Sequence, residues 1–260
     1  MRFRILLLLL VISAIAAHAD QWNKDYSVAG TPELRVDSGD GSIVVKSWDR
    51  SAISARVTTE GYKIGPGHVR IDEHQEGNNV QISVHEPHMV MFSFSRHTIR
   101  IELMVPRQTN LDLHSGDGHI ELEQVRGTMR LDTGDGHIEA RSLDGSLRAR
   151  TSDGAIRVQG RFDNLELHTG DGHVEAQVAA GSRMNSGWSV STSDGSVNLH
   201  LPGEFAADLD ARTGDGHITL DFPVTVSGSF GQNKIRGKMN GGGQVLEIRT
   251  SDGNITLERS

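Results

Sequence analysis

Apolar and polar residues alternate along most of this chain. Around Gly136, for example, Met129 and Leu131 precede the glycine and Ile138 and Ala140 follow it, with polar residues between them. A period of two residues is typical of a β-strand that buries one face, because successive side chains point to opposite sides. Apolar patterns with the helical period are hard to find, so the sequence predicts an all-β chain.

A six-residue motif interrupts the alternation eight times. Each copy contains Ser or Thr, then Gly or Ser, then Asp-Gly, one variable residue, and Ile or Val. The positions 7 and 5 residues before the Gly of Asp-Gly, and 2 and 4 residues after it, are apolar in all eight copies. Each copy is therefore predicted to be a strand, an Asp-Gly turn and a second strand. The motif glycines are Gly41, Gly118, Gly136, Gly154, Gly172, Gly195, Gly216 and Gly253.

The spacing of the copies favours a β-solenoid. The central copies are 18 residues apart, whereas the later steps are 23, 21 and 37 residues and the first step is 77. Similar residues at one position of many copies are expected when the copies stack as coils. A second, weaker turn at Arg126-Gly127 and Asp144-Gly145 fits a coil of 18 residues. The alternative is an antiparallel β-hairpin repeat or sandwich, because Asp-Gly between alternating strands often closes a hairpin.

Residues 1–19 are predicted to be a cleavable signal peptide. Arg2 and Arg4 precede an uncharged run of 13 residues, 5–17, and Ala17-His18-Ala19 gives the small-x-small pattern of a cleavage site. The run is shorter than the about 20 apolar residues that cross a membrane. We therefore expect residues 20–260 to be exported as a single β-repeat domain, with no membrane span once the signal is removed.

Residues 111–260 of that domain hold the regular repeats. Residues 47–110 lack the motif but still alternate, so they are predicted to be an N-terminal strand region or a cap. The segment 222–244 is predicted to be a degenerate coil with a Gly-rich loop at Gly241-Gly242-Gly243. Asp accepts hydrogen bonds from nearby backbone N–H groups in tight turns, and the Gly of each Asp-Gly is expected to take a positive φ.

These motifs resemble the DUF4097 family of β-strand-repeat proteins, which are described as candidate adhesins. The resemblance rests on the Leu-x-Val-x-Ser-Gly-Asp-Gly-Ser-Ile start at Leu34, the Val105-Pro106 step, the reiterated Thr-Gly-Asp-Gly-His-Ile, and the last copy at Ser251. It covers roughly residues 31–257. The resemblance implies a β-helix-like solenoid at the cell surface or in the periplasm, and it supplies no catalytic residues. This chain departs from the pattern in having His after several turns.

The charge of the chain limits its partners. Removal of Arg2 and Arg4 with the signal lowers the number of basic residues from 26 to 24 against 34 acidic residues, a net charge of −10. Such a charge argues against nucleic acid as a partner. An envelope or extracellular protein or glycan is expected instead. The chain has no Cys, so it carries neither a disulfide nor the lipid-modified Cys of a lipoprotein.

Stacked turns would place acidic and histidine side chains in columns at about 4.8 Å spacing. The first explanation is turn chemistry, which needs no cofactor. Calcium on a carboxylate column, or zinc beside the histidines, is the alternative, although Ala155 and Ser196 interrupt the His column. We assign no metal ligands from sequence. The side chains concerned are Asp117, Asp135, Asp153 and Asp171, with His119, His137, His173 and His217.

The sequence indicates a protein without catalysis, an adhesin-like binding or structural module of the cell envelope. One alternative is a periplasmic accessory partner of another envelope protein. The other is a polysaccharide-active β-helix enzyme, for which Arg130, Arg148 and Arg150 are candidate basic residues on the outward face. No Ser/His/Asp order and no distinct pair of carboxylates stands out from the repeats, which favours binding over catalysis.

Overall fold

The computed structural model describes residues 19–87 and 97–260. Their regular structure consists of 21 β-strands and no helix, so the all-β prediction is confirmed. No helix with the length and hydrophobicity needed to cross a membrane occurs in these two ranges. The predicted signal peptide lies outside the described residues, except for Ala19, which begins β1 (Ala19–Ser27).

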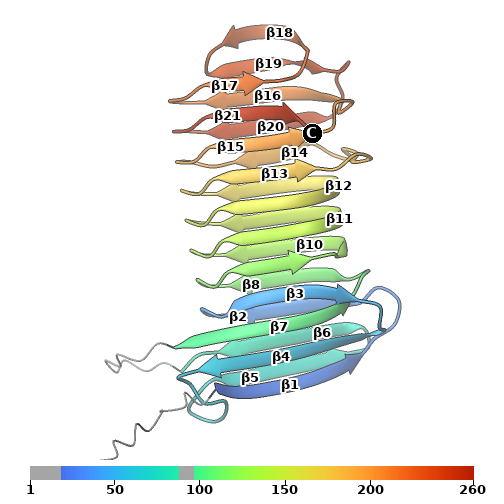
Figure 1. Ribbon diagram of the computed structural model, residues 1–260, viewed down its shortest axis with the longest axis vertical. Coiled ribbons are helices and arrows are strands. Elements are labelled where there is room, and N and C mark those ends of the chain that lie inside the picture. Colours follow the sequence, from blue (N-terminus) through green and yellow to red (C-terminus); the bar gives the residue numbers. More distant parts are fainter. Residues whose placement is uncertain (1–18, 88–96) are drawn as a thin grey trace, which may run out of the picture.

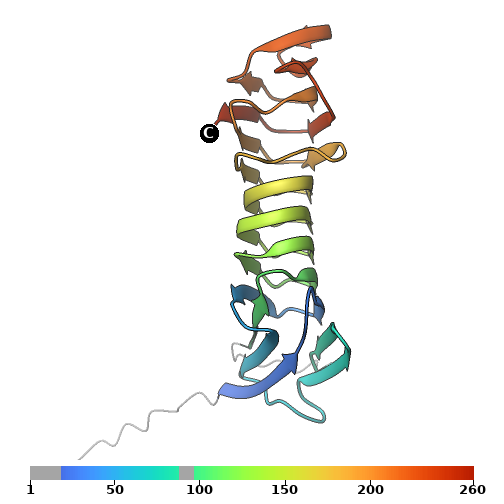
Figure 2. The same ribbon diagram turned by 90° about the vertical axis from the view of Figure 1, so that its right-hand side faces the viewer.

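The strands form a tall stack with two faces (Figures 1 and 2). The strands before each Asp-Gly turn form face A, and those after it form face B, while β11 (Ile138–Thr151) and β12 (Ile156–Thr169) begin on face B and end on face A. In spatial order, face A contains β6 (Asn79–His85), β2 (Glu33–Ser38), β8 (Asn110–Ser115), β10 (Arg126–Thr133), the ends of β11 and β12, β14 (Trp188–Ser191), β20 (Val245–Thr250) and β16 (Ala207–Thr213). Face B contains β7 (Thr98–Pro106), β3 (Ser42–Trp48), β9 (Ile120–Glu123), the starts of β11 and β12, β13 (Val174–Val178), β15 (Val197–Leu201), β21 (Ile255–Arg259) and β17 (Ile218–Leu220).

Neighbouring rungs of the stack are parallel and in register. Leu131 pairs with Ala149, and Ile138 pairs with Ile156, which is the 18-residue offset of the motif. In the part of the chain that the structure describes, the segments directly before and after each Asp-Gly turn pair with segments of other rungs and not with each other across the turn. Where β10 pairs with β11 and β11 with β12, the pairing is parallel and joins equivalent segments of neighbouring rungs. The turns are therefore not the tight hairpins of the alternative architecture.

The rungs do not follow chain order at either end. The rung of β2 and β3 lies between that of β6 and β7 and that of β8 and β9, so Leu34 pairs with both Val80 and Leu111. The rung of β20 and β21 likewise lies between those of β14 with β15 and β16 with β17. The long sequence steps of 77 and 37 residues coincide with these two rearrangements.

Antiparallel strands cover the stack at both of its ends. At the N-terminal end, β4 (Ala52–Glu60) pairs with β7 and β1, and β5 (Arg70–Glu76) pairs with β6. At the other end, β19 (Lys234–Met239) pairs with β16 and β18 (Val224–Gly231). The prediction of a degenerate coil over 222–244 is therefore wrong, since these residues run antiparallel to their neighbours. Charged residues along β5 suit an edge strand, because they discourage further pairing.

The core lies between the two faces and consists of the apolar motif columns. Leu131 and Ile138, which flank one turn, are 0% and 1% exposed. His137, which lies between them in the sequence, is exposed to solvent. Trp188 replaces the leucine of its column and is buried against the rings of Phe162 and Phe205. The predicted inward and outward facing is thus confirmed for these residues.

Candidate functional site

The eight Asp-Gly turns stack along one edge of the molecule, which we call the turn ridge. The Ser or Thr that begins each motif is buried in every copy. Thr151 Oγ1 donates to the carbonyl of Gly136 in the neighbouring rung, at 2.9 Å, and accepts from the amide of Gly154 in its own turn, at 3.2 Å. One hydroxyl therefore closes its own turn and joins it to the next, which explains why Ser or Thr stands at this position.

The motif glycines are required by close stacking and not by a left-handed backbone. The expected positive φ is wrong: Gly136 is not among the residues with positive φ, whereas Gly127 and Gly145 in the second turn have φ of 144° and 132°. A Cβ on Gly136 would lie closer than 3.0 Å to the carbonyl of Gly118, which belongs to the rung below. The same overlap with a neighbouring motif glycine recurs at Gly154.

The residue after each motif glycine forms a ladder of side-chain acceptors. His119 Nδ1 accepts from the backbone N–H of His137, and His137 Nδ1 accepts from that of Ala155, both at 2.9 Å. The rings of His119 and His137 are stacked with centroids 5.1 Å apart. His173 Nδ1 accepts from the N–H of Ser196 at 3.1 Å. A metal binds a histidine through either Nδ1 or Nε2, and in these three residues Nδ1 is already engaged.

Ser and Asn take the same role in the copies that lack His. Ser196 Oγ accepts from the N–H of Asn254 at 3.3 Å, and Asn254 Oδ1 accepts from that of His217 at 3.0 Å. In five copies the side chain at this position therefore accepts a backbone hydrogen bond from the neighbouring rung. Ala155 interrupts the ladder because its methyl group accepts nothing.

The aspartates of the turn ridge are exposed, as Asp117 and Asp135 show. Among residues 19–87 and 97–260, no group of three or more His, Asp or Glu side chains is placed to hold a metal ion. At the N-terminal end of the ridge, Glu86 accepts from the backbone N–H of Asp40 at 2.7 Å. Burial, together with the nearby carboxylates of Asp40 and Asp117, raises the pKa of Glu86. That the ridge needs no cofactor, with a divalent cation as the alternative, stays a prediction.

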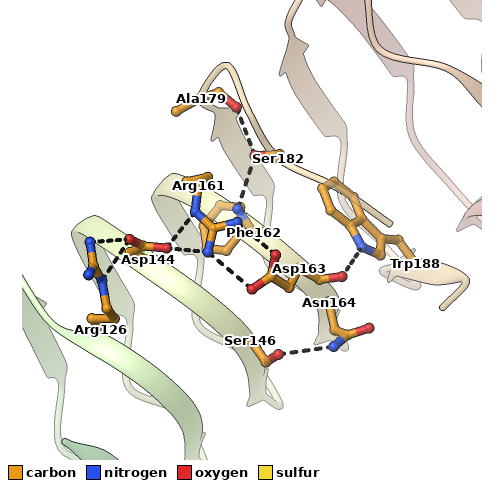
Figure 3. Close-up of polar contacts among 10 residues, drawn as sticks. All are labelled: Arg126, Asp144, Ser146, Arg161, Phe162, Asp163, Asn164, Ala179, Ser182 and Trp188. Atoms are coloured by element: carbon orange, nitrogen blue, oxygen red, sulfur yellow. Dashed lines mark hydrogen bonds and ion pairs between the residues drawn. The ribbon is translucent and has the colours of Figure 1, made fainter. Parts of the chain in front are cut away.

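A loop of residues 179–187 interrupts the stack on the opposite edge, between β13 and β14 (Figure 1). It accounts for the motif step of 23 residues in place of 18. Ser182 Oγ donates to the carbonyl of Ala179 at 2.7 Å and accepts from the N–H of Phe162 at 3.0 Å (Figure 3). Trp188 Nε1 donates to the carbonyl of Asp163 at 3.4 Å. The base of the loop is therefore fixed to β12 by hydrogen bonds.

An ion-pair network supports the same edge (Figure 3). Asp144 accepts from Arg126 at 2.8 Å and from Arg161 at 2.5 Å. Arg161 also donates to both carboxylate oxygens of Asp163, at 2.7 and 3.0 Å. These bonds raise the pKa of Arg161 and hold the pKa of Asp163 below its ordinary value. The four charges neutralise one another, so the network stabilises the second turn.

A shallow cleft lies on face A beside the base of this loop. Its volume is about 190 Å³. Asn164 donates to Ser146 Oγ at 3.0 Å and accepts from Ser186 Oγ at 2.7 Å, so the loop and the strands share one polar chain. We call this depression the face A cleft. It is lined by Thr128, Arg130, Ser146, Arg148, Asn164, Glu166, Ser186 and Gly187, with the buried Met129, Leu147 and Leu165 at its floor.

Arg148 of the face A cleft shares one carboxylate with Arg150, which lies beside the cleft. Glu166 Oε1 lies 2.6 Å from Arg150 and 3.4 Å from Arg148. In the described part of the chain, Arg130 makes no ion pair. The cleft therefore presents guanidinium, hydroxyl and amide groups together, which suits recognition of a polar ligand that carries negative charge.

Residues 107–258 match the family model described as Toastrack DUF4097, which is more than half of the chain. This protein belongs to the Toastrack DUF4097 family. The resemblance seen in the repeats is thereby confirmed. No curated protein matches the chain.

Solved structures show only a distant likeness to this Toastrack chain. A protein from Clostridium sporogenes, described as a candidate cell adhesion protein, is 11% identical, with 92% of this chain and 100% of that one covered and a TM-score of 0.42. A candidate adhesin from Bacteroides fragilis is 14% identical, with coverages of 92% and 97% and a TM-score of 0.44. A candidate lipid-binding protein from Parabacteroides distasonis is 14% identical, with coverages of 92% and 96% and a TM-score of 0.40. At these values the likeness assigns neither a ligand nor an activity.

The two sets of candidate residues from the sequence, the Asp and His columns and the three arginines, lie at different places on the molecule. The Asp and His columns of the Toastrack repeats lie on the turn ridge, where the His side chains support the backbone. Arg130, Arg148 and Arg150 lie together on face A, two of them in the cleft. Asn164, Ser146 and Ser186 were not among the residues predicted from the sequence. The extra five residues between two motif copies were the available signal for the loop.

Completing the ladder at its gap should stabilise the protein. In Ala155→Ser, the new hydroxyl is expected to accept from the N–H of His173, as Ser196 does from Asn254. We expect a gain of about 1 kcal/mol in the free energy of unfolding, the net contribution of one hydrogen bond. Urea titration measures it. Ala155→Val is the matched control because its side chain has no acceptor. A gain as large in the valine variant would show that the ladder does not limit stability at this rung.

Proposed function

We propose that this protein is an exported, non-catalytic binding module of the cell envelope. In this proposal residues 20–260 form a single β-solenoid domain of 18-residue coils that presents its faces to an envelope or extracellular partner. The parallel register between copies supports the solenoid. The single observation that carries the binding role is the face A cleft, where the guanidinium group of Arg130, which forms no ion pair among the described residues, stands beside the hydroxyl and amide groups of the inserted loop and its neighbouring strands.

The composition of the face A cleft supports binding over catalysis. Hydrolysis of a glycosidic bond uses two carboxyl groups on either side of the bond. Among the residues that line this cleft, Glu166 is the one carboxylate, and Arg148 and Arg150 both engage it. One carboxylate cannot fill both of these positions. The enzyme alternative therefore has no support from this site.

Co-sedimentation with isolated cell envelopes tests the proposed function. We expect the purified protein to sediment with envelopes of its own organism, and the double variant R130A/R148A to remain in the supernatant. The matched control is R141A/R157A, which removes two exposed arginines from face B. Equal sedimentation of both double variants would show that the binding surface lies outside the cleft. Failure of the unaltered protein to sediment would overturn the proposal of an envelope-binding module.

A further inference from the structure

We infer that the ligand of the face A cleft is an acidic glycan, whose sugar carboxylate is held by Arg130 and Arg148. This inference rests on the proposed binding function and adds the chemical class of the ligand. It follows from the charges of the cleft, from its neutral polar groups and from the absence of an apolar anchor point in its lining.

The two arginines form a repulsive pair in the protein alone. Arg130 and Arg148 are register partners on adjacent parallel strands, at a spacing of about 4.8 Å. Like charges that face one another across strands are destabilising. Glu166 compensates only part of this charge, because it lies nearer to Arg150 than to Arg148. A carboxylate bound between the guanidinium groups would relieve the repulsion and accept paired, charge-assisted hydrogen bonds.

The other acidic groups of this face do not fill that position. Asp112 is the register partner of Arg130 on β8, and Asp132 is that of Arg150. In the described residues neither carboxylate forms an ion pair with these arginines, and neither lines the cleft. Within the lining of the cleft itself, Arg130 and Arg148 stand against the single carboxylate of Glu166, so the lining has one more positive than negative charge in a chain whose formal net charge is −8.

Neutral donors and acceptors continue from the arginines toward the loop. Thr128, Ser146 and Asn164 occupy one register position on three successive strands. Asn164 bridges Ser146 and Ser186, which fixes the orientation of its amide group. A row of hydroxyl and amide groups beside two guanidinium groups matches a ligand that has many hydroxyls and one carboxylate per unit, which describes a uronic or sialic acid glycan.

The floor of the cleft argues against a peptide ligand. Protein and peptide interfaces take most of their affinity from aromatic or aliphatic side chains that fill apolar pockets. Met129, Leu147 and Leu165 at the floor are 1%, 2% and 2% exposed, so they offer almost no apolar surface. An acidic peptide would find the charges but no anchor point. The observations therefore favour a glycan.

Calorimetry with defined oligosaccharides tests the inference. The probes are hexagalacturonate, a hyaluronan hexasaccharide and a sialic acid trimer, with maltohexaose as the neutral glycan and hexaglutamate as the acidic peptide. We expect one or more of the carboxylated glycans to bind, maltohexaose not to bind, and added salt to weaken binding. R130A/R148A should raise the dissociation constant about tenfold or more, the size expected for loss of a charge-assisted contact.

R141A/R157A on face B is again the matched control and should leave the dissociation constant unchanged. Thermal melts of both variants verify folding, since all four side chains lie at the surface. If maltohexaose bound as tightly as the carboxylated glycans, the role of the carboxylate would be overturned. If hexaglutamate bound more tightly than those glycans, the glycan class would be overturned. Binding of none of the three acidic glycans would also overturn the inference. Envelope co-sedimentation decides the proposed function separately, so the two failures are distinguishable.

Discussion

Gly136→Ala is expected to lower the free energy of unfolding by about 3 kcal/mol or more, at the upper end of the cost of overpacking. The added Cβ would overlap the carbonyl oxygen and carbon of Gly118, which are backbone atoms of the rung below. A backbone contact gives way less easily than the end of a flexible side chain, because movement of one turn disturbs the pairing of the whole rung. Urea titration monitored by circular dichroism measures the change.

Gly203→Ala is the matched control for this substitution. Gly203 lies in an exposed turn, has no positive φ, and has no atom within 4 Å of the added methyl group. Its replacement should change stability by less than about 0.5 kcal/mol, as is usual at the surface. If Gly136→Ala were equally mild, the turns would not be stacked as closely as the structure shows, and close stacking would not explain the motif glycines.

The alternation and the motif predicted local structure correctly. Burial of Leu131 and Ile138 and exposure of His137 follow from a period of two, because a strand with one buried face imposes that period. The identity of the motif columns also predicted which residues become neighbours, as the pairing of Ile138 with Ile156 shows. These features depend on residues close in sequence or on exact repetition, and both are visible without a structure.

The order of the rungs could not be predicted in the same way. Leu34 has equivalent partners in Val80 and Leu111, and the structure pairs it with both, one on each side. Any two rungs with the same apolar columns can stack, so the sequence contains no clear signal that β2 and β3 lie between two later rungs. The antiparallel direction of β19 is hidden for a related reason, because alternation looks the same in either direction.

The candidate sites show how far functional residues could be predicted from the sequence. The sequence favoured turn chemistry for the Asp and His columns and kept a metal as the alternative, and the structure shows that His119 and His137 accept backbone hydrogen bonds between rungs, a role that their sequence positions did not reveal. The face A cleft combines Arg130 with Ser186, which are far apart in sequence and meet only because the inserted loop is fixed against β12. A contact of that kind depends on three-dimensional arrangement, and sequence spacing gave only the position of the loop.

Ile138→Ala and Ile218→Ala should differ in cost although both residues occupy the same motif position. Ile138 is 1% exposed and lies between Ile120 and Ile156 of the two adjacent rungs. Ile218 begins the last rung of face B, pairs with Ile255 on one side, and is only half-buried. Truncation of a buried isoleucine costs about 2–5 kcal/mol, since the loss of apolar burial adds to the cost of the cavity.

We therefore expect a loss of about 2–5 kcal/mol for Ile138→Ala and of about 1 kcal/mol for Ile218→Ala, where less apolar area is removed from contact. Urea titrations of the two variants, with comparison of midpoint and slope, measure the difference. Identical local sequence around the two turns, Thr-Gly-Asp-Gly-His-Ile, makes Ile218 a close internal control. Equal costs would mean that each turn stabilises its own isoleucine. A several-fold larger cost at Ile138 would support stabilisation of a rung by the rungs on both sides of it, because Ile138 has an isoleucine partner in both adjacent rungs and Ile218 has one in a single adjacent rung.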